Sequence, residues 1–534
     1  MIKKLLPLFF VFFYIACTNT SDPANNNGAA GRDTSINSRN SYNTVFFDSV
    51  GLEKFIIANG YKDSFANRLR NFYNNRNFQY AWFNGNELSD FASTFYEMQN
   101  EYIDYAKDST LYDEDLAKLF DSVSADDYQV NMQDSITLKT ELMLTSQFFR
   151  YAKKAYQGNN PQINAKDLEW FIPRRKVDAI ATLDSMLASN GKNIDAYEPV
   201  NEQYKLLKNY LLKYYAIQKQ GGWLKIENIK KSLKQGDSAD VIPSIKKRLL
   251  ATNDFTGTDT SKIFTPKFAE AVKHFEHRYG TKEDGIVTQS LINEMNKPVE
   301  DLINTMLVNM ERMRWMPAIP KTDYLLANIP EFKVHAYENG NYVWDMNVVV
   351  GKTGHNTEIF TGNMKYVVFS PYWNVPTSIL KAEILPAIQR NPNYLASHNM
   401  EWNNGSVRQK PGAQNSLGLV KFLFPNEYNI YFHDTPAKSL FSEDSRAFSH
   451  GCIRLSEPKK LAEWLLRNNK SWTSDKISKA MNAGKEQTVT LQPGVPVFIG
   501  YFTAWVDKDG QLNFRNDIYG HDAKMIKQLF ASKQ

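Results

Sequence analysis

The chain has 534 residues, of which 42% are hydrophobic and 23% charged, and its mean hydropathy is −0.49. This composition is typical of globular domains and excludes a collagen-like, coiled-coil or wholly disordered chain. At roughly 150 residues per domain, the length predicts about three domains. The net charge of +5 is spread along the chain without a basic run, which argues against a nucleic-acid-binding surface. Two cysteines, Cys17 and Cys452, exclude a disulfide scaffold.

The first residues have the pattern of a targeting segment. Two lysines precede an apolar run, residues 5–16, that ends at Cys17. The run is shorter than the ~20 residues that span a bilayer, and it matches a secretory signal. The cysteine at its end resembles a bacterial lipoprotein signal, which implies a signal peptide over 1–17, a lipidated Cys17 and membrane anchoring on the periplasmic side of the cell envelope. The alternative is an ordinary cleaved signal. Residues 18–45, rich in Asn, Ser, Thr and Gly, predict a flexible tether.

Residues 46–222 are predicted to form a helical scaffold domain. Apolar side chains repeat at helical spacing around Leu69, Leu142 and Leu211. The sequence of this region has no metal-ligand spacing and no pairing of a nucleophile with a base. We therefore expect it to support chemistry that takes place elsewhere in the chain.

Residues 223–298 are predicted to form a smaller helical unit. Phe268, Val272, Phe275 and Tyr279 repeat at helical spacing, and Gly280 is placed to end that helix. The LKQGD entry at 233–237, the AVKHF helix at 271–275 and the DGIV turn at 284–287 resemble the three-helix peptidoglycan-binding domain. The resemblance implies that this unit binds peptidoglycan or positions its neighbour.

The last part of the chain, 299–534, changes to a period of two. Two alternating runs joined at Asn339-Gly340 predict a β-hairpin. Further strands are predicted at 365–376, 420–424 and 428–434, and a helix at 458–466. An insertion is predicted at about 379–412 and begins with two helical segments. The loop after these segments, 403–418, is expected to lack regular structure.

The chemistry is expected around His433 and Cys452. A cysteine nucleophile needs a nearby base, and a histidine and a cysteine that bracket a loop can face each other when the flanking segments are neighbours. Gly451 lets the backbone approach closely, so that N–H groups can point at a developing oxyanion. His450 adjoins this turn and is not expected to be the base. Asp434 would point to the opposite face of its strand, so we expect a backbone carbonyl to orient His433.

These residues lie in a family signature. The pattern His433-x15-SHGCIRL resembles that of the YkuD-type L,D-transpeptidase family, and other stretches resemble its large, multi-domain YcbB-like branch. Those stretches are MERMRWMP (310–317), VVVGK (348–352), VVFSPYWNVPTSI (367–379), LGLVKFLFPN (417–426), the terminal segment 501–520, and LRNFYNNRNFQYAWF (69–83), which resembles the scaffold domain of that branch. The resemblance covers nearly all of the chain after the tether.

The resemblance implies a multi-domain α+β fold with a helical scaffold domain, a three-helix peptidoglycan-binding module and a β-rich catalytic domain whose helical insertion, 379–412, caps the substrate. It implies Cys452 as nucleophile, His433 as general acid/base, and the N–H groups of Gly451 and Cys452 as oxyanion donors. The implied substrate-binding residues are Tyr431, Ser449, His450, Arg454, Trp373 and Asn374. For Arg454, holding a stem-peptide carboxylate and bracing the loop are both open. For Trp373, core packing is the alternative.

The family reaction is acyl transfer between peptidoglycan stem peptides during cell wall biogenesis. It implies a tetrapeptide donor, an amine acceptor, a cysteine thioester, 3→3 cross-links, no metal or cofactor, and inhibition by carbapenems. Water as acceptor would make an L,D-carboxypeptidase. In an NlpC-type wall peptidase the cysteine precedes the histidine, which is not the order here. A non-catalytic peptidoglycan-binding lipoprotein would be expected to have lost Cys452 or His433.

Overall fold

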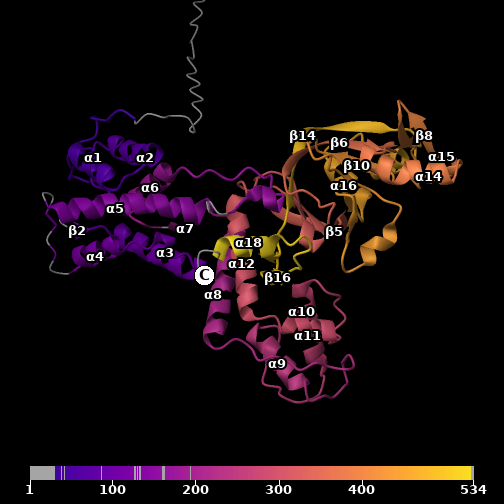
Figure 1. Ribbon diagram of the computed structural model, residues 1–534, viewed down its shortest axis with the longest axis horizontal. Coiled ribbons are helices and arrows are strands. Elements are labelled where there is room, and N and C mark those ends of the chain that lie inside the picture. The colour runs from indigo at the N-terminus through magenta and orange to yellow at the C-terminus, as the bar shows by residue number, and fades with distance from the viewer. Residues whose placement is uncertain are drawn as a thin grey trace, which may run out of the picture. The chain divides into compact units, whose positions relative to one another are not determined.

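The computed structural model describes residues 30–530, except 38, 41–42, 86, 126–127, 129, 132–133, 159–162 and 193 (Figure 1). The predicted signal segment, Cys17 and part of the predicted tether lie outside the described residues. No helix among the described residues is both long and apolar enough to cross a membrane. The chain divides into two compact units. One holds the described residues of Met1–Asn100, Leu111–Arg150 and Asp178–Tyr197, and the other those of Glu101–Thr110, Tyr151–Val177 and Glu198–Gln534.

The first unit is helical, as predicted, and the faces predicted around Leu69 and Leu142 are buried. The buried Glu141 carboxylate accepts the N–H groups of Ala81 and Trp82 at 2.8 and 3.0 Å, and burial raises its pKa to about 7. Its elements are α1 (Ser49–Ala58), α2 (Asp63–Asn74), β1 (Phe83–Asn84), β2 (Glu87–Leu88), α4 (Glu114–Val123), α6 (Ala179–Ala188), α7 (Ile194–Tyr197), and most of α3 (Asp90–Ala106) and α5 (Ser135–Tyr151).

The division differs from the predicted scaffold domain at 46–222. Helix α8 (Glu202–Lys219) belongs to the second unit, where it packs along α12 (Val299–Trp315). The Tyr204 hydroxyl of α8 accepts a 2.7 Å hydrogen bond from Arg314 of α12 and lies 2.9 Å from the Tyr105 hydroxyl. These buried polar contacts join segments far apart in sequence, and helical periodicity does not reveal them. Also in this unit are most of η1 (Ser109–Leu111) and all of η2 (Ala152–Tyr156) and η3 (Ala165–Leu168).

The predicted three-helix unit is present. Its helices are α9 (Ile242–Ala251), α10 (Pro266–Tyr279) and α11 (Gln289–Met295). The predicted inner face of α10 is buried at Phe268, Val272 and Phe275. Gly280 ends α10 in the left-handed conformation, with φ of +65°, which confirms the predicted stop.

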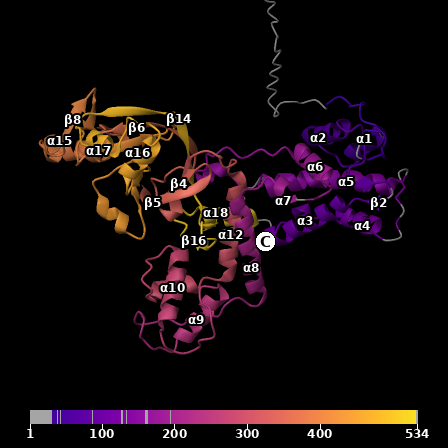
Figure 2. The same ribbon diagram turned by 180° about the vertical axis from the view of Figure 1, so that it is seen from behind.

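The main sheet of the β-rich part closes on itself at β5 and leaves β12 outside the ring. The order is β12-β5-β13-β11-β10-β6-β14-β3-β4, and β4 also pairs with β5, so the ladder closes into a barrel. In Figures 1 and 2, β14 runs beside β6, its antiparallel partner. The strands are β3 (Tyr324–Asn328), β4 (Lys333–Glu338), β5 (Asn341–Gly351), β6 (Thr361–Phe369), β10 (Val420–Leu423), β11 (Phe432–His433), β12 (Ala447–Ser449), β13 (Ile453–Leu455) and β14 (Gln487–Gly500), with η4 (Ile329–Glu331) after β3.

Two predictions for the strands have different outcomes. The hairpin turn at Asn339-Gly340 is confirmed, since both residues have positive φ, as a two-residue turn between twisted strands requires. The strand predicted at 428–434 is mostly wrong, because only β11 pairs there. The Asn426 side chain accepts the N–H groups of Tyr428 and Ile430 and holds a turn in place of the strand's first half.

The insertion is a small folded unit with its own core, made by Val375, Leu380, Ile384, Met400 and Val407. It begins before the predicted 379, because β7 pairs with β9 in a three-stranded sheet. The expectation of irregular structure over 403–418 is wrong in part, since β8 and β9 form a hairpin across Asn404-Gly405, both with positive φ. The elements are β7 (Trp373–Asn374), α13 (Thr377–Ile379), η5 (Leu380–Ile384), α14 (Leu385–Arg390), α15 (Tyr394–Ser397), β8 (Met400–Asn403) and β9 (Ser406–Gln409).

The remaining elements complete the second unit. The predicted helix at 458–466 is confirmed as α16 (Pro458–Leu466), which lies beside α17 (Ser474–Met481) (Figure 2). The hairpin of β15 (Ala504–Val506) and β16 (Leu512–Phe514) packs against α8 and α10. The last described helix is α18 (His521–Phe530), and η6 (Lys438–Ser442) follows β11.

Candidate active site

The structure brings the histidine and the cysteine to the same part of the sheet. Strand β11 pairs in parallel with β13, with Phe432 opposite Ile453 and His433 opposite Arg454. Cys452 immediately precedes β13, and Tyr431 immediately precedes β11, where its carbonyl accepts the N–H of Ile453 at 3.2 Å. Because side chains alternate along a strand, residues two apart share a face. Tyr431 and His433 therefore lie on one face. Because β11 pairs with β13, the loop between His433 and Cys452 joins neighbouring strands, as the sequence predicted.

The Cys452 side chain is partly exposed and lies beside Tyr431. Its thiol donates to the Asn429 carbonyl at 3.6 Å. Burial raises the pKa of the thiol above its ordinary value, although hydrogen bonds from the main chain and hydroxyl of Tyr431 and the charge of Arg454 act to lower it. At neutral pH Cys452 is therefore mostly a thiol. Within the described part of the chain, no hydrogen bond joins this thiol to His433.

His433 is prepared to accept a proton. It is buried, with 4% of its surface exposed, and its Nδ1–H donates to the main-chain carbonyl of Asp434. This confirms the predicted carbonyl partner and leaves the Nε2 lone pair free. Burial, reinforced by the charge of Arg454, lowers the pKa of His433 to about 3, so the ring is neutral. The Asp434 carboxylate points elsewhere and accepts the N–H of Leu419 at 2.8 Å.

Residues 449–452 form a tight turn, which we call the nucleophile turn. Gly451 has φ of +112°, a conformation that favours glycine. Ser449 is 2% exposed, and its hydroxyl donates to the Cys452 carbonyl at 2.6 Å while accepting the Gly451 N–H at 3.1 Å. Ser449 thus braces the turn, although the sequence placed it among the substrate-binding residues. Of the two predicted oxyanion donors, the Gly451 N–H is engaged, whereas no hydrogen bond among the described residues uses the Cys452 N–H.

The other predicted binding residues lie in different surroundings. His450 is 3.4 Å from the Glu383 carboxylate of η5 and so links the nucleophile turn to the insertion. Arg454 lies close enough to influence Cys452 electrostatically, its Nε is buried, and no described residue hydrogen-bonds its guanidinium. Trp373 packs against the core of the insertion, which supports the packing alternative, and Asn374 is exposed on β7. The predicted set is therefore split between the turn and the insertion.

Two residues that the sequence did not single out support the turn from behind. The Thr357 hydroxyl donates to the Gly451 carbonyl at 2.7 Å and accepts the Gly351 N–H at 2.9 Å. Tyr519 accepts the Thr357 N–H at 3.2 Å and donates to the Gly351 carbonyl at 2.6 Å. Both are buried. A lone threonine in a loop carries no sequence signal, and the only signal for Tyr519 was its place in the terminal 501–520 stretch.

Comparison with protein families finds two matches along the chain. The family described as the L,D-transpeptidase catalytic domain, YkuD, matches residues 322–499, which span most of the barrel, the insertion, Cys452 and His433. Residues 322–499 thus resemble an L,D-transpeptidase catalytic domain. A second family, described as a scaffold domain, matches residues 67–211. This catalytic domain and scaffold domain, in a multi-domain α+β fold, confirm the resemblance drawn from the motifs.

Similar proteins carry the same description. A curated Haemophilus influenzae protein named "Putative L,D-transpeptidase" is 29% identical over 246 residues, which are 42% of this chain and 49% of that protein. The chain thus spans about half the length of this relative. An L,D-transpeptidase structure from Xylanimonas cellulosilytica has 13% identity, covering 51% of this chain and 100% of that one, with a TM-score of 0.18. One from Stackebrandtia nassauensis has 13% identity, covering 50% and 95%, with a TM-score of 0.23.

Proposed function

We propose that this chain is an L,D-transpeptidase that forms 3→3 cross-links between peptidoglycan stem peptides through a thioester on Cys452. The observation that carries the proposal is the pairing of β11 with β13. This pairing sets Cys452 beside Tyr431 and brings the neutral, buried His433 to the same face, within a catalytic domain of this family. A cysteine and a neutral histidine base are sufficient for acyl transfer through a covalent intermediate.

In the first half-reaction Nε2 of His433 takes the thiol proton as Sγ attacks the carbonyl carbon of the third stem residue. We assign the Cys452 N–H, which has no partner among the described residues, to donation to the oxyanion. The bond to the terminal D-alanine then breaks, and His433 returns the proton to the departing amine. A thioester remains on Cys452.

In the second half-reaction the amine of a neighbouring stem attacks the thioester. His433 accepts a proton from that amine, and the departing thiolate of Cys452 is then protonated, so the enzyme returns to its starting state. If water attacks instead, the product is a shortened stem and the activity is that of an L,D-carboxypeptidase. The outcome depends on which acceptor reaches the thioester first.

Two features support roles in holding the donor stem. The Arg454 guanidinium lies near Cys452 and has no described hydrogen-bond partner, so we assign it to a stem-peptide carboxylate and not to bracing the loop. The contact between His450 and Glu383 connects the nucleophile turn to the insertion. We therefore assign the insertion to covering the donor and limiting the access of water to the thioester.

The activity is tested by incubating the purified protein with sacculi, digesting them and identifying muropeptides by mass spectrometry. Cross-linked 3→3 dimers are expected, and they should be absent with Cys452→Ala. Shortened stems without dimers would assign the chain to the carboxypeptidases. Carbapenem is expected to add one adduct per chain at Cys452, because a strained carbonyl replaces the donor amide. The absence of both a peptidoglycan product and a carbapenem adduct would contradict the proposal.

We also propose that the protein is a lipoprotein anchored on the periplasmic side of the cell envelope through Cys17. The apolar run at 5–16, the cysteine at its end and the polar stretch after it support this, since several acyl chains together give stable anchoring. Cys17→Ala should move the protein from the membrane fraction to the soluble fraction. A variant that remains in the membrane pellet would contradict lipidation.

A further inference from the structure

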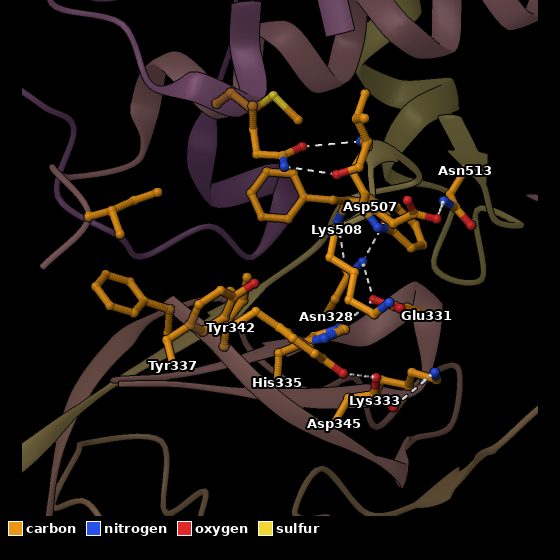
Figure 3. Close-up of a pocket in the computed structure, with 18 of the residues that line it drawn as sticks. Asn328, Glu331, Lys333, His335, Tyr337, Tyr342, Asp345, Asp507, Lys508 and Asn513 are labelled. Atoms are coloured by element: carbon orange, nitrogen blue, oxygen red, sulfur yellow. Dashed lines mark hydrogen bonds and ion pairs between the residues drawn. The ribbon is translucent and has the colours of Figure 1, made fainter. Parts of the chain in front are cut away.

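A cavity of about 330 Å³ lies on the outer face of the barrel (Figure 3). Side chains of β3, β4 and β5 form one side, the β15–β16 hairpin forms the facing side, and the end of α12 closes it. In Figure 3, Tyr337, Tyr342 and His335 project from the strands toward the side that carries Asp507 and Lys508. Among the residues that line it, none belongs to the nucleophile turn. A cavity of this size is in the lower part of the range for small-molecule sites.

Aromatic rings dominate the strand side of this cavity. Tyr324 and Tyr337 are cross-strand neighbours whose rings stack at 4.3 Å, and Tyr342 is the next neighbour of Tyr337 across β4 and β5. Trp505 lines the facing side. The hydroxyls of Tyr324 and Tyr337 and the indole N–H of Trp505 make no hydrogen bond within the described residues. The cavity thus offers flat apolar surfaces edged by available polar groups.

The charged side chains that line the cavity are largely paired with one another. His335 lies 2.8 Å from the Glu331 carboxylate, and Lys333 lies 2.9 Å from that of Asp345. Asp507 accepts from Asn513 and lies 3.6 Å from His277, Lys508 pairs with Asp509 at 2.6 Å, and Arg515 stacks over Trp505. Opposite charges at such distances offset each other's fields, so no strong net charge selects an anion or a cation.

We propose that this cavity binds a neutral sugar ring, namely an N-acetylated sugar of a glycan strand. A sugar has an apolar face that stacks on an aromatic ring and a rim of hydroxyls that bind fixed donors and acceptors. Those are the two kinds of surface that the cavity provides. The chemical class rests on the cavity alone, whereas the glycan strand as its source rests on the proposed function.

The distance from the cavity to the nucleophile turn limits which ring of a glycan strand the cavity can hold. Asp345 in the cavity wall and Gly351 beside the nucleophile turn are six residues apart on β5, which is about 20 Å at the rise of a strand. The three stem residues up to the attacked carbonyl span about 10 Å when extended. A sugar held in the cavity therefore lies farther from Cys452 than the stem attached to it can reach, and it would be a ring elsewhere on the same strand.

The test uses calorimetry to measure how tightly the N-acetylglucosamine trimer binds to the full chain carrying Cys452→Ala. Tyr337→Ala added to that chain should weaken binding about tenfold or more, because it removes one stacked ring. Tyr337→Phe keeps the ring and should weaken binding less, which separates stacking from misfolding. Tyr112→Ala, on a tyrosine that is 59% exposed in the first unit, is the matched control and should leave affinity unchanged.

The outcomes separate the cavity from the proposed reaction. No binding of the trimer, unchanged affinity in the Tyr337→Ala chain, or preferential binding of a sugar-free stem tetrapeptide would each overturn the sugar site. Carbapenem adducts are measured in parallel on chains with Cys452 intact and should form equally with and without Tyr337→Ala. If no carbapenem adduct forms on the chain without substitutions, the proposed function is contradicted, whereas the sugar site is not.

Discussion

The pKa values of two histidines on the barrel strands shift in opposite directions. His433 meets a main-chain carbonyl and the nearby charge of Arg454, and burial followed by that charge lowers its pKa to about 3. His335 meets the Glu331 carboxylate at 2.8 Å, and this partner raises its pKa despite burial. Burial acts in the same direction on both rings. The charge of the neighbour therefore decides in which direction the pKa of each histidine shifts.

The difference matches the two kinds of site. A base that must accept a thiol proton has to be neutral, and His433 is neutral across the physiological range. A wall that holds a neutral ligand needs its charges compensated, and His335 with Glu331 is one such pair. The Cys452 pKa is also raised, so the resting site holds a thiol beside a neutral imidazole instead of an ion pair.

The strongest test of the catalytic side of this comparison is Cys452→Ala. It should abolish thioester formation, since no other cysteine among the described residues can replace the nucleophile. Intact-mass analysis after incubation with carbapenem checks this directly. The thermal midpoint should stay close to that of the parent, because a small, partly exposed side chain is trimmed. A carbapenem adduct on the Cys452→Ala variant would show that another residue is the nucleophile.

His433→Ala should lower the acylation rate by roughly 10²–10⁴-fold, the usual loss when a general acid/base is removed. His398→Ala, on an exposed histidine of the insertion, is the control and should acylate normally. Because protonation of His433 removes the base, the rate should fall as the pH decreases through its lowered pKa. The acid limb should therefore have its midpoint far below 6.5, towards about 3. A midpoint near 6.5 would contradict the neutral, carbonyl-bound ring.

Thr357→Val tests whether the brace behind the nucleophile turn matters. It removes the donor to the Gly451 carbonyl and the acceptor of the Gly351 N–H. A small displacement of the turn should lower kcat for acylation by about 10–100-fold with little change in KM. Thr357→Ser keeps the hydroxyl and should recover most of the rate, whereas Thr353→Val, on an exposed threonine of the same loop, should have no effect. Failure of serine to rescue would assign Thr357 to packing alone.

The features that the sequence predicted are those encoded within one continuous stretch of the chain. His433 and Cys452 sit in one continuous stretch, so their loop, the glycine of the turn and the carbonyl partner could be inferred locally. The hairpin at Asn339-Gly340 depends on two residues that tolerate positive φ, and it was found for that reason. Asn404-Gly405 has the same chemistry but lies among polar residues without clear alternation, and its hairpin was missed.

Features assembled from distant segments were not predicted. The cavity combines residues from Asn201 to Arg515, and periodicity within a segment does not show which outer faces of a barrel meet. The division of the chain depends on contacts such as Tyr204 with Arg314, more than a hundred residues apart. Asp507 and Lys508 lie in the terminal family-like stretch, yet their position in the cavity wall depends on how the β15–β16 hairpin packs against α8 and α10.

The smallest expected effect concerns the His335 side of the comparison. Glu331→Gln removes the carboxylate that raises the pKa of His335 and should lower the stability of the second unit by about 1–3 kcal/mol. Glu270→Gln breaks the exposed pair with Lys273 and should leave the thermal midpoint unchanged. Thermal unfolding of the second unit, followed separately from the first, provides the measurement.

The pH dependence of that loss identifies the pair. His335 has a folded pKa raised above its ordinary 6.5, so its contribution to stability is complete below 6.5 and is lost as the pH rises through the raised value. Glu331 has a folded pKa below its ordinary 4.5, so its contribution is present above 4.5 and is lost as the pH falls through the lowered value. The difference between the parent and Glu331→Gln should therefore be greatest between about pH 4.5 and 6.5 and should shrink on either side. A difference that is constant from pH 4 to 9 would mean that Glu331 acts by packing, and that charge pairing does not hold this wall of the cavity.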